Sequence, residues 1–211
     1  MIDLAELTIN VAEGNVSEAV KFTHKALVAG IPAREILDKG LLPAMDRVGS
    51  SFEKSEIFLP ELLMAGDAMR ATIELLRPEL AKKGTAYVGK YVIGTVQGDL
   101  HSIGKDIVVM MLEGNGWEVT DLGTDVSPEK FREVIKNGDF DILGLSALLT
   151  FTMPMIAETI SALKASRLRG RVKIMIGGAP VTQSFADQIG ADVYVKDAVE
   201  AVAKAKRLVN R

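Results

Sequence analysis

The spacing of apolar residues changes near the middle of the 211-residue chain, and this change is the strongest constraint on its fold. Up to about residue 84, apolar side chains recur at roughly every third or fourth position, as on one face of a helix. Beyond residue 85, short apolar runs bounded by glycine alternate with helical stretches, as in repeated strand–helix units. We therefore expect two domains, a helical domain over residues 1–84 and an α/β domain over residues 85–211.

The first domain is predicted to be a bundle of about four or five helices, because nothing in it resembles a strand. Ser17 is the expected cap of the second helix, and Gly30 is expected to end it. Pro32 suits the first turn of the third helix, and Pro78 is expected to interrupt the last one. The expected helices cover residues 4–13, 18–29, 32–40, 43–52 and 61–83.

The second domain contains a succession of strand–helix units. Such units predict a parallel sheet covered by helices on both faces. The expected strands cover residues 91–96, 117–122, 141–146, 172–176 and 193–195, and the helices that follow begin near residues 105, 128, 154, 182 and 199. Because ligands of such sheets bind outside the carboxyl ends of the strands, the candidate binding segments are 97–104, 146–152 and 177–182.

The charge balance excludes several classes of partner. Lys and Arg number 25 and Asp and Glu number 28, so the net charge of -3 offers no basic surface for nucleic acid or an anionic membrane. The first residues are acidic where a signal peptide is basic, and apolar runs fall far short of the ~18 residues that span a membrane. We expect a cytoplasmic protein with neither nucleic acid nor membrane as a partner.

Side chains that bind transition metals are scarce in this sequence. Cysteine is absent, which removes disulfides, thiolate metal sites and cysteine nucleophiles, and which fits a reducing compartment. The histidines are His24 and His101. A transition metal held by this protein would therefore be expected to use one of them.

Chemistry-bearing residues gather in the loop after the first predicted strand. The glycines and Lys105 there suggest a phosphate-binding loop, but the spacing rejects it. Five residues separate Gly98 from Gly104, and Asp106 follows the lysine where such a loop needs serine or threonine. The dinucleotide-binding pattern G-x-G-x-x-G is also missing. Nucleotide binding is therefore not expected.

Asp99 and His101 stand two positions apart in the same loop. A metal-ligating imidazole needs one free nitrogen, and a nearby carboxylate that holds the other nitrogen fixes the tautomer and makes the ligand more basic. The same spacing is also compatible with a solvated histidine beside a solvated acid. Spacing alone leaves both interpretations open.

Three motifs, in this order, resemble the signature of methyl-transferring cobalamin-binding domains. They are Asp99-x-His101-x-x-Gly104, Ser146-x-Leu148 and Gly177-Gly178, each at the end of a predicted strand. This family includes the corrinoid proteins of methanol, methylamine and methoxy-aryl methyltransfer systems and the cobalamin module of methionine synthase. The resemblance covers nearly the whole chain, because those proteins also carry a helical bundle before a flavodoxin-like (Rossmann-type) five-stranded domain.

The resemblance implies that the α/β domain binds cobalamin or a related corrinoid, such as methylcobalamin, whose nucleotide tail is detached from cobalt and buried. It implies that His101 is the lower axial ligand of cobalt and that Asp99 holds the other ring nitrogen. Thr152 falls where methionine synthase has a serine that continues this relay, so Asp99, His101 and Thr152 are the implied catalytic residues. Further implied contacts to the corrinoid are Gly98, Ser102, Ile103, Gly104, Ser146, Leu148, Thr150, Gly177 and Gly178.

The family also gives the helical domain a role, as a cap over the upper face of the corrin. The matching positions are Phe52 and Leu59, and Pro60 beside the Ser55-Glu56 stretch suggests that they bracket a turn. A capped methyl group is out of reach of a second protein. We therefore expect the cap to swing about a linker near Gly84.

The function implied by the resemblance is that of a methyl carrier. It takes a methyl group from a donor-specific methyltransferase and delivers it to a second methyltransferase that acts on a tetrahydrofolate-type pterin or a thiol, and a reductive activase is a third partner. The chain is expected to be a methyltransferase component without a complete active site. The alternatives are a cobalamin-dependent sensor, which usually carries a DNA-binding domain not evident here, and the small subunit of an adenosylcobalamin mutase.

Overall fold

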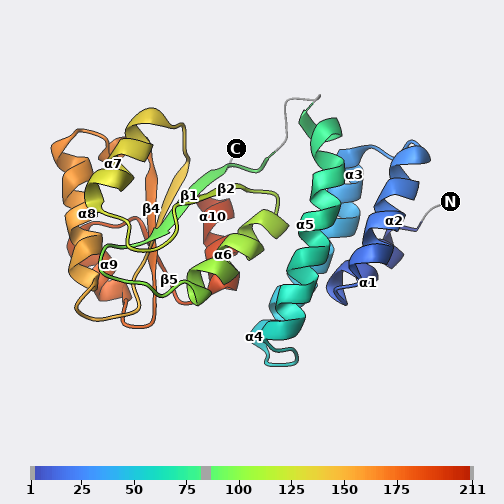
Figure 1. The fold of residues 1–211 in the computed structure, drawn as a ribbon, viewed down its shortest axis with the longest axis horizontal. Helices are drawn as coiled ribbons and strands as arrows, with labels where there is room; N and C mark the ends of the chain where they lie inside the picture. Colours follow the sequence, from blue (N-terminus) through green and yellow to red (C-terminus); the bar gives the residue numbers. More distant parts are fainter. Residues whose placement is uncertain (1–2, 82–86, 210–211) are drawn as a thin grey trace. The chain divides into compact units, whose positions relative to one another are not determined.

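A computed structural model describes residues 3–81 and 87–209 of the chain (Figure 1). The described residues form two compact units, of which one comprises the chain up to Val88 with residues 113–116, and the other comprises residues 89–112 and the chain from Trp117 onward. The predicted boundary between residues 84 and 85, and the linker near Gly84, lie outside the described residues. In the ranges 3–81 and 87–209, no helix combines the length and apolar character that crossing a bilayer requires.

The helical unit confirms the predicted bundle. Its longest helix, α5 (Leu59–Ala81), lies along α2 (Val16–Val28) and also contacts the other helices of the unit (Figure 1). The remaining elements are α1 (Leu4–Ala12), α3 (Ala33–Ile36), a π-helical turn (Leu37–Leu41) and α4 (Leu42–Glu53). Apolar side chains from all of these elements are fully buried between them, among them Leu7, Ile36, Leu41, Met45, Leu62 and Met69.

Two local predictions in this unit are corrected by the structure. Ser17 does not cap α2, because the helix begins at Val16, two residues earlier than expected, and Asn15 stands at the cap position. Pro78 does not interrupt α5, which continues to Ala81. A proline removes one helical hydrogen bond, and the burial of Leu76 and Leu80 on either side of it favours the helix.

The α/β unit confirms the predicted five-stranded parallel sheet. The strands are β1 (Lys90–Thr95), β2 (Glu118–Asp121), β3 (Ile142–Ser146), β4 (Lys173–Gly177) and β5 (Val193–Val195), in the spatial order β2-β1-β3-β4-β5. The helices α6 (Ile103–Gly114) and α10 (Ala198–Leu208) lie on one side of the sheet, and α7 (Pro128–Asn137), α8 (Met153–Ala165) and α9 (Gln183–Ile189) on the other (Figure 1). Inward-facing residues of the strands and of α7, α8 and α9 form one buried apolar cluster.

The strand order creates a topological switch point between β1 and β3. The chain leaves β1 toward β2 on one side and later enters β3 on the other side of β1. The register pairs Thr95 with Ser146 at the carboxyl ends of these strands, and Ser146 pairs in turn with Gly177 of β4. Crevices for ligands form at such points, so the fold places the loops after β1, β3 and β4 around one edge.

Candidate functional site

The loop after β1 is held by hydrogen bonds to its neighbours in the sheet. Gly98 has a φ of 80°, a left-handed conformation, and its amide donates to Oδ1 of Asp125 at 2.7 Å. The hydroxyl of Thr95 donates to the carbonyl of His101 at 3.0 Å. The loop is therefore held at Gly98 and at His101, on either side of Asp99.

The carboxylate of Asp99 is the centre of the site. It is fully buried, and its Oδ1 accepts from Nδ1 of His101 at 2.8 Å and from the His101 amide at 3.1 Å. Its Oδ2 accepts from the amides of Leu148 and Leu149 at 2.7 and 3.3 Å, and it lies 2.8 Å from the hydroxyl of Thr152. The switch point thus joins the loops after β1 and β3 through one side chain.

The surroundings of Asp99 keep its carboxylate ionised. Burial alone would raise its pKa, but the hydrogen bonds donated by Leu148, His101 and Thr152 outweigh burial and hold the pKa well below its ordinary value. An ionised carboxylate accepts hydrogen bonds and donates none, so the proton in the 2.8 Å contact belongs to Nδ1 of His101.

His101 presents a free nitrogen to solvent as a result. With the proton on Nδ1, the neutral imidazole carries its lone pair on Nε2. The side chain is 51% exposed although its partner Asp99 is buried. The arrangement is that of a histidine oriented by a carboxylate, with the second nitrogen available to a metal or a proton.

Thr152 occupies the outer position of this network. The residue is buried at the N-terminus of α8, and its hydroxyl lies 2.8 Å from both Oδ2 of Asp99 and the carbonyl of Leu149. A hydroxyl has one proton and donates to one acceptor at a time. The Thr152 hydroxyl thus has two acceptors within reach, the ionised carboxylate of Asp99 and the main-chain carbonyl of Leu149.

Exposed apolar side chains surround the Asp99–His101 pair. Leu100 is 74% exposed, Ile103 69%, Leu148 41% and Phe151 72%, and each is within two residues of a member of the hydrogen-bond network. The sequence interpretation did not single out Leu100 and Phe151, although their position beside Asp99, His101 and Thr152 was a usable signal. A group of exposed apolar side chains around a polar centre is typical of a binding site.

The surroundings of Gly178 require a glycine, whereas those of Gly104 do not. At Gly178, φ is +133° and a Cβ would lie 1.8 Å from the carbonyl oxygen of Ala147, so the contact between the loops after β3 and β4 itself requires glycine. At Gly104, a Cβ would meet nothing within 4 Å. The protein's own packing therefore explains Gly178, whereas Gly104 faces open space.

The other residues predicted to contact the corrinoid lie at strand ends, in the loop after β3 or at the start of α6. Ser102, Ile103 and Gly104 begin or precede α6, Ser146 ends β3, Thr150 lies exposed in the following loop, and Gly177 ends β4. Phe52 lies near the end of α4 and Leu59 begins α5, so they do bracket a turn, within the helical unit.

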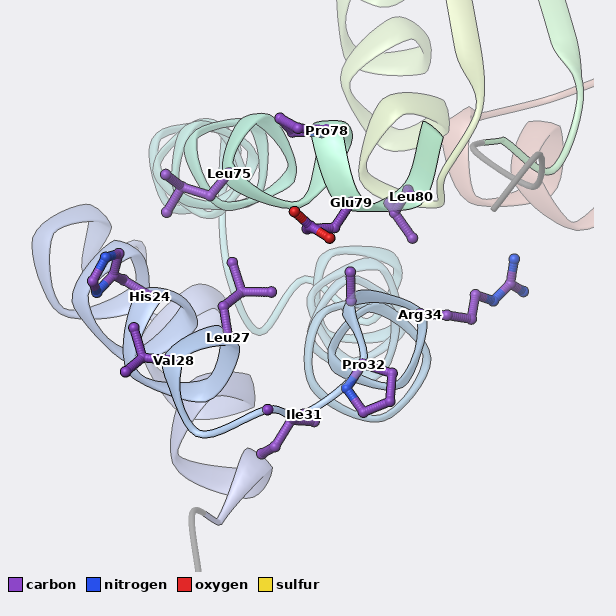
Figure 2. Close-up of a pocket in the computed structure, with 12 residues that line it drawn as sticks. His24, Leu27, Val28, Ile31, Pro32, Arg34, Leu75, Pro78, Glu79 and Leu80 are labelled. Carbon is purple, nitrogen blue, oxygen red and sulfur yellow. The ribbon is translucent and has the colours of Figure 1, made fainter. Parts of the chain in front are cut away.

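The second histidine, His24, has a different setting. It lines a hollow of about 640 Å³ in the helical unit, with Arg34 and Glu79 among largely apolar neighbours such as Leu27 and Leu75 (Figure 2). Among the residues that the structure describes, no three His, Asp or Glu side chains gather as a metal-binding cluster, here or elsewhere. A metal that needs only one ligand from the protein is the kind that the Asp99–His101 pair suits.

Comparison with known proteins identifies the family. Residues 89–205 match a B12 binding domain, and residues 4–77 match a second B12 binding domain. The chain is 45% identical over 207 residues to dimethylamine corrinoid protein 3 of Methanosarcina acetivorans, which covers 98% of this chain and 95% of that protein.

Solved structures agree with this assignment. A cobalamin-binding protein from Desulfitobacterium hafniense superposes with a TM-score of 0.82 at 33% identity, over 99% of both chains. The methanol:cobalamin methyltransferase complex from Methanosarcina barkeri gives a TM-score of 0.83 at 29% identity, over 96% of this chain and 78% of that one. The chain therefore belongs to the family of B12-binding corrinoid proteins and is related to the methylamine and methanol corrinoid proteins of methyltransferase systems.

Proposed function

We propose that this protein is the methyl carrier of a methyltransferase system for methylated amines, and that His101 is the lower axial ligand of its cobalt. A bound corrinoid would supply the cobalt that carries the methyl group, and the protein would add His101 as its one ligand to that cobalt and control access to it. The observation that carries the proposal is the buried, ionised Asp99, which directs the free Nε2 of the half-exposed His101 outward.

The residues around His101 fit a large, partly apolar ring system. Leu100, Ile103, Leu148 and Phe151 offer exposed apolar surface beside the imidazole. The open space at Gly104 leaves room for a group that approaches the start of α6. We assign Gly98, Ser102, Ser146, Thr150, Gly177 and Gly178, which lie along the same strand ends, to the binding of the corrinoid and its tail.

Asp99 and Thr152 would orient His101 toward the metal. Nδ1 of His101 donates to the ionised Asp99, and this contact would keep Nε2 directed at the cobalt. The Thr152 hydroxyl lies at the other carboxylate oxygen, Oδ2, and would keep Asp99 turned toward His101.

Phe52 and Leu59 are the proposed cap residues over the methyl group. The proposed partners are a methylamine methyltransferase, an acceptor methyltransferase for a pterin or thiol, and a reductive activase. The relative named for dimethylamine and the solved methanol methyltransferase complex support a methyltransferase as one of these partners.

The ligand assignment is tested by electron paramagnetic resonance of the protein reconstituted with Co(II) cobalamin. His24→Ala is a matched control, because it removes the other histidine and leaves His101 in place. We expect splitting by an axial histidine nitrogen, altered by ¹⁵N-histidine, in the wild type and in His24→Ala, and its loss in His101→Ala. The ligand assignment is wrong if His101→Ala keeps this splitting, and the proposed function is wrong if the wild type takes up no corrinoid.

The donor is tested with purified methylamine methyltransferases. Methylation of the reconstituted protein from dimethylamine or trimethylamine, and its absence with methanol and a methanol-specific enzyme, is the expected result. The reverse preference would contradict the methylamine assignment and leave the cobalt-ligand result unaffected.

A further inference from the structure

A buried lysine joins the two ends of the His101 loop. The side chain of Lys105 is 1% exposed, and its ammonium lies 2.5 Å from Oδ2 of Asp121 and 2.6 Å from Oδ1 of Asp106. Burying a cation is costly unless it is paired and hydrogen-bonded, and these two carboxylates meet that requirement.

One arm of this cluster runs through Asp121 to the beginning of the loop. The other oxygen of Asp121 accepts from the Gly123 amide at 2.9 Å, which fixes the turn after β2. Farther along this turn, Asp125 accepts from the amide of Gly98 at 2.7 Å and donates its own amide to the carbonyl of Asp99 at 3.0 Å. Lys105 thus holds the start of the turn after β2, and Asp125 of this turn hydrogen-bonds the main chain of Gly98 and Asp99.

The other arm runs through Asp106 to the end of the loop. The amide of Asp106 donates to the carbonyl of Ser102 at 2.8 Å, and the Ser102 hydroxyl bonds its carboxylate. Burial would raise the pKa of Asp106, but the hydrogen bonds from Lys105 and Ser102 and the charge of Lys105 lower it. Lys105 is therefore attached to the residue that directly follows His101.

The geometry points to Lys105 as a positioning residue for cobalt ligation. Together with Asp121 and Asp106 it forms a clamp, here named the Lys105 clamp, that fixes both ends of residues 98–102 and so the direction of the His101 ring. The part of this inference that concerns ligation rests on the proposed function, whereas the fixing of the loop does not. A lysine at the start of a helix near a corrinoid loop would ordinarily be assigned to surface contacts, but its burial between two carboxylates excludes such contacts for this ammonium.

The clamp is tested first without corrinoid, by amide hydrogen exchange in Lys105→Met. Removal of the charge should raise exchange at the amides of Gly98, Asp125 and Asp106 by at least about tenfold, because hydrogen bonds to charged groups are among the stronger ones. Arg169→Met is the matched control, since it removes another ion pair of the α/β unit, between Arg169 and Asp192 at 2.7 Å. The control should raise exchange at Ile174, whose amide donates to Asp192, and leave Gly98 unchanged.

Asp121→Asn keeps the inference falsifiable if Lys105→Met does not fold. Its carboxylate is partly exposed, and the variant leaves the contact of Lys105 with Asp106 intact. It should raise exchange at Gly98 and Asp125 and spare Asp106. Unchanged exchange at Gly98 in a folded variant, or an equal rise in Arg169→Met, would overturn the clamp.

The role in ligation is tested by the Co(II) resonance at equal corrinoid occupancy. We expect the axial nitrogen splitting to be lost in a measurable fraction of the Lys105→Met molecules and to be complete in Arg169→Met. A faster-exchanging loop with complete splitting would overturn the positioning role. No splitting in the wild type would instead overturn the proposed function, and the exchange result would still decide on the clamp.

Discussion

The hydroxyl of Thr152 lies 2.8 Å from Oδ2 of Asp99, whereas His101 bonds the other oxygen of the same carboxylate. The two contacts come from loops that follow different strands, and they meet because β1 and β3 are neighbours in the sheet. A change at Thr152 therefore reaches His101 through the charge of Asp99 and not through a direct contact.

Replacing Thr152 with Val removes the hydroxyl and keeps the shape of the side chain. We expect the free energy of unfolding to fall by about 1 kcal/mol and the pKa of Asp99 to move toward its ordinary value, because one donor is lost. Urea unfolding at pH 7 and a carbon NMR titration of the Asp99 carboxyl group measure the two effects. Thr152→Ser keeps the hydroxyl and should lie close to wild type; equal losses in both variants would instead assign the effect to the methyl group.

Replacing Asp99 with Asn should destabilise the protein by about 2–3 kcal/mol at pH 7. The neutral amide accepts weaker hydrogen bonds than the carboxylate does from the surrounding N–H and O–H donors. The lowered pKa of Asp99 contributes stability above the unfolded value, near ~4, and this contribution is lost as the pH falls through the lower folded value. The stability gap between wild type and Asp99→Asn should therefore narrow progressively below about pH 4. Urea unfolding from pH 7 to strongly acidic pH measures the gap, and a gap independent of pH would contradict the ionised carboxylate.

Gly178 and Gly104 should respond differently to alanine. Gly178→Ala should lower the free energy of unfolding by roughly 3 kcal/mol or more, since its φ of +133° and the approach of Ala147 both exclude a side chain. Gly104→Ala should leave the corrinoid-free protein equally or more stable, because it lies in α6 and its Cβ has open space. Its affinity for cobalamin should nevertheless fall, and unchanged affinity would remove Gly104 from the binding site.

Phe151→Ser should weaken cobalamin binding by about tenfold and leave the stability of the corrinoid-free protein within ~0.5 kcal/mol, because the ring is exposed. Val28→Ser is a matched control, since Val28 is an equally exposed apolar residue of the helical unit. Isothermal titration with cobalamin compares the two. A similar loss of affinity in both variants would show that the exposed apolar residues beside His101 have no special part in binding.

The order of elements was predictable because their periodicity is strong. The first strand was expected over residues 91–96 and spans Lys90–Thr95, and the long helix expected over 61–83 spans Leu59–Ala81. The order of the strands in the sheet was not predictable from this pattern, because consecutive strand–helix units are compatible with several parallel orders. The flavodoxin-like fold was expected only through the family resemblance, and the structure shows its switch point between β1 and β3.

The site shows the same division between local and distant contacts. The contact of Asp99 with His101 was one of two interpretations of a local spacing, whereas Thr152 lies 53 positions from Asp99 and was reached only through the family resemblance. The burial of Lys105 was not predicted, since Lys105 lies in α6 and its partner Asp121 ends β2, 16 positions away. Ser17 was expected to cap α2 because serine is a preferred cap residue, but Asn15 occupies that position.

Three of the donors that surround Asp99 belong to the main chain, those of His101, Leu148 and Leu149. Substitution of a side chain does not delete an amide, and among the ordinary amino acids proline alone lacks one. The negative charge at the centre of the site is therefore buffered against mutation, and the loop after β3 is free to vary its side chains toward a different corrinoid or partner. Proline at position 148 is the exception, because it would remove the shortest of these contacts. The pKa of the Asp99 carboxyl would then rise toward its ordinary value.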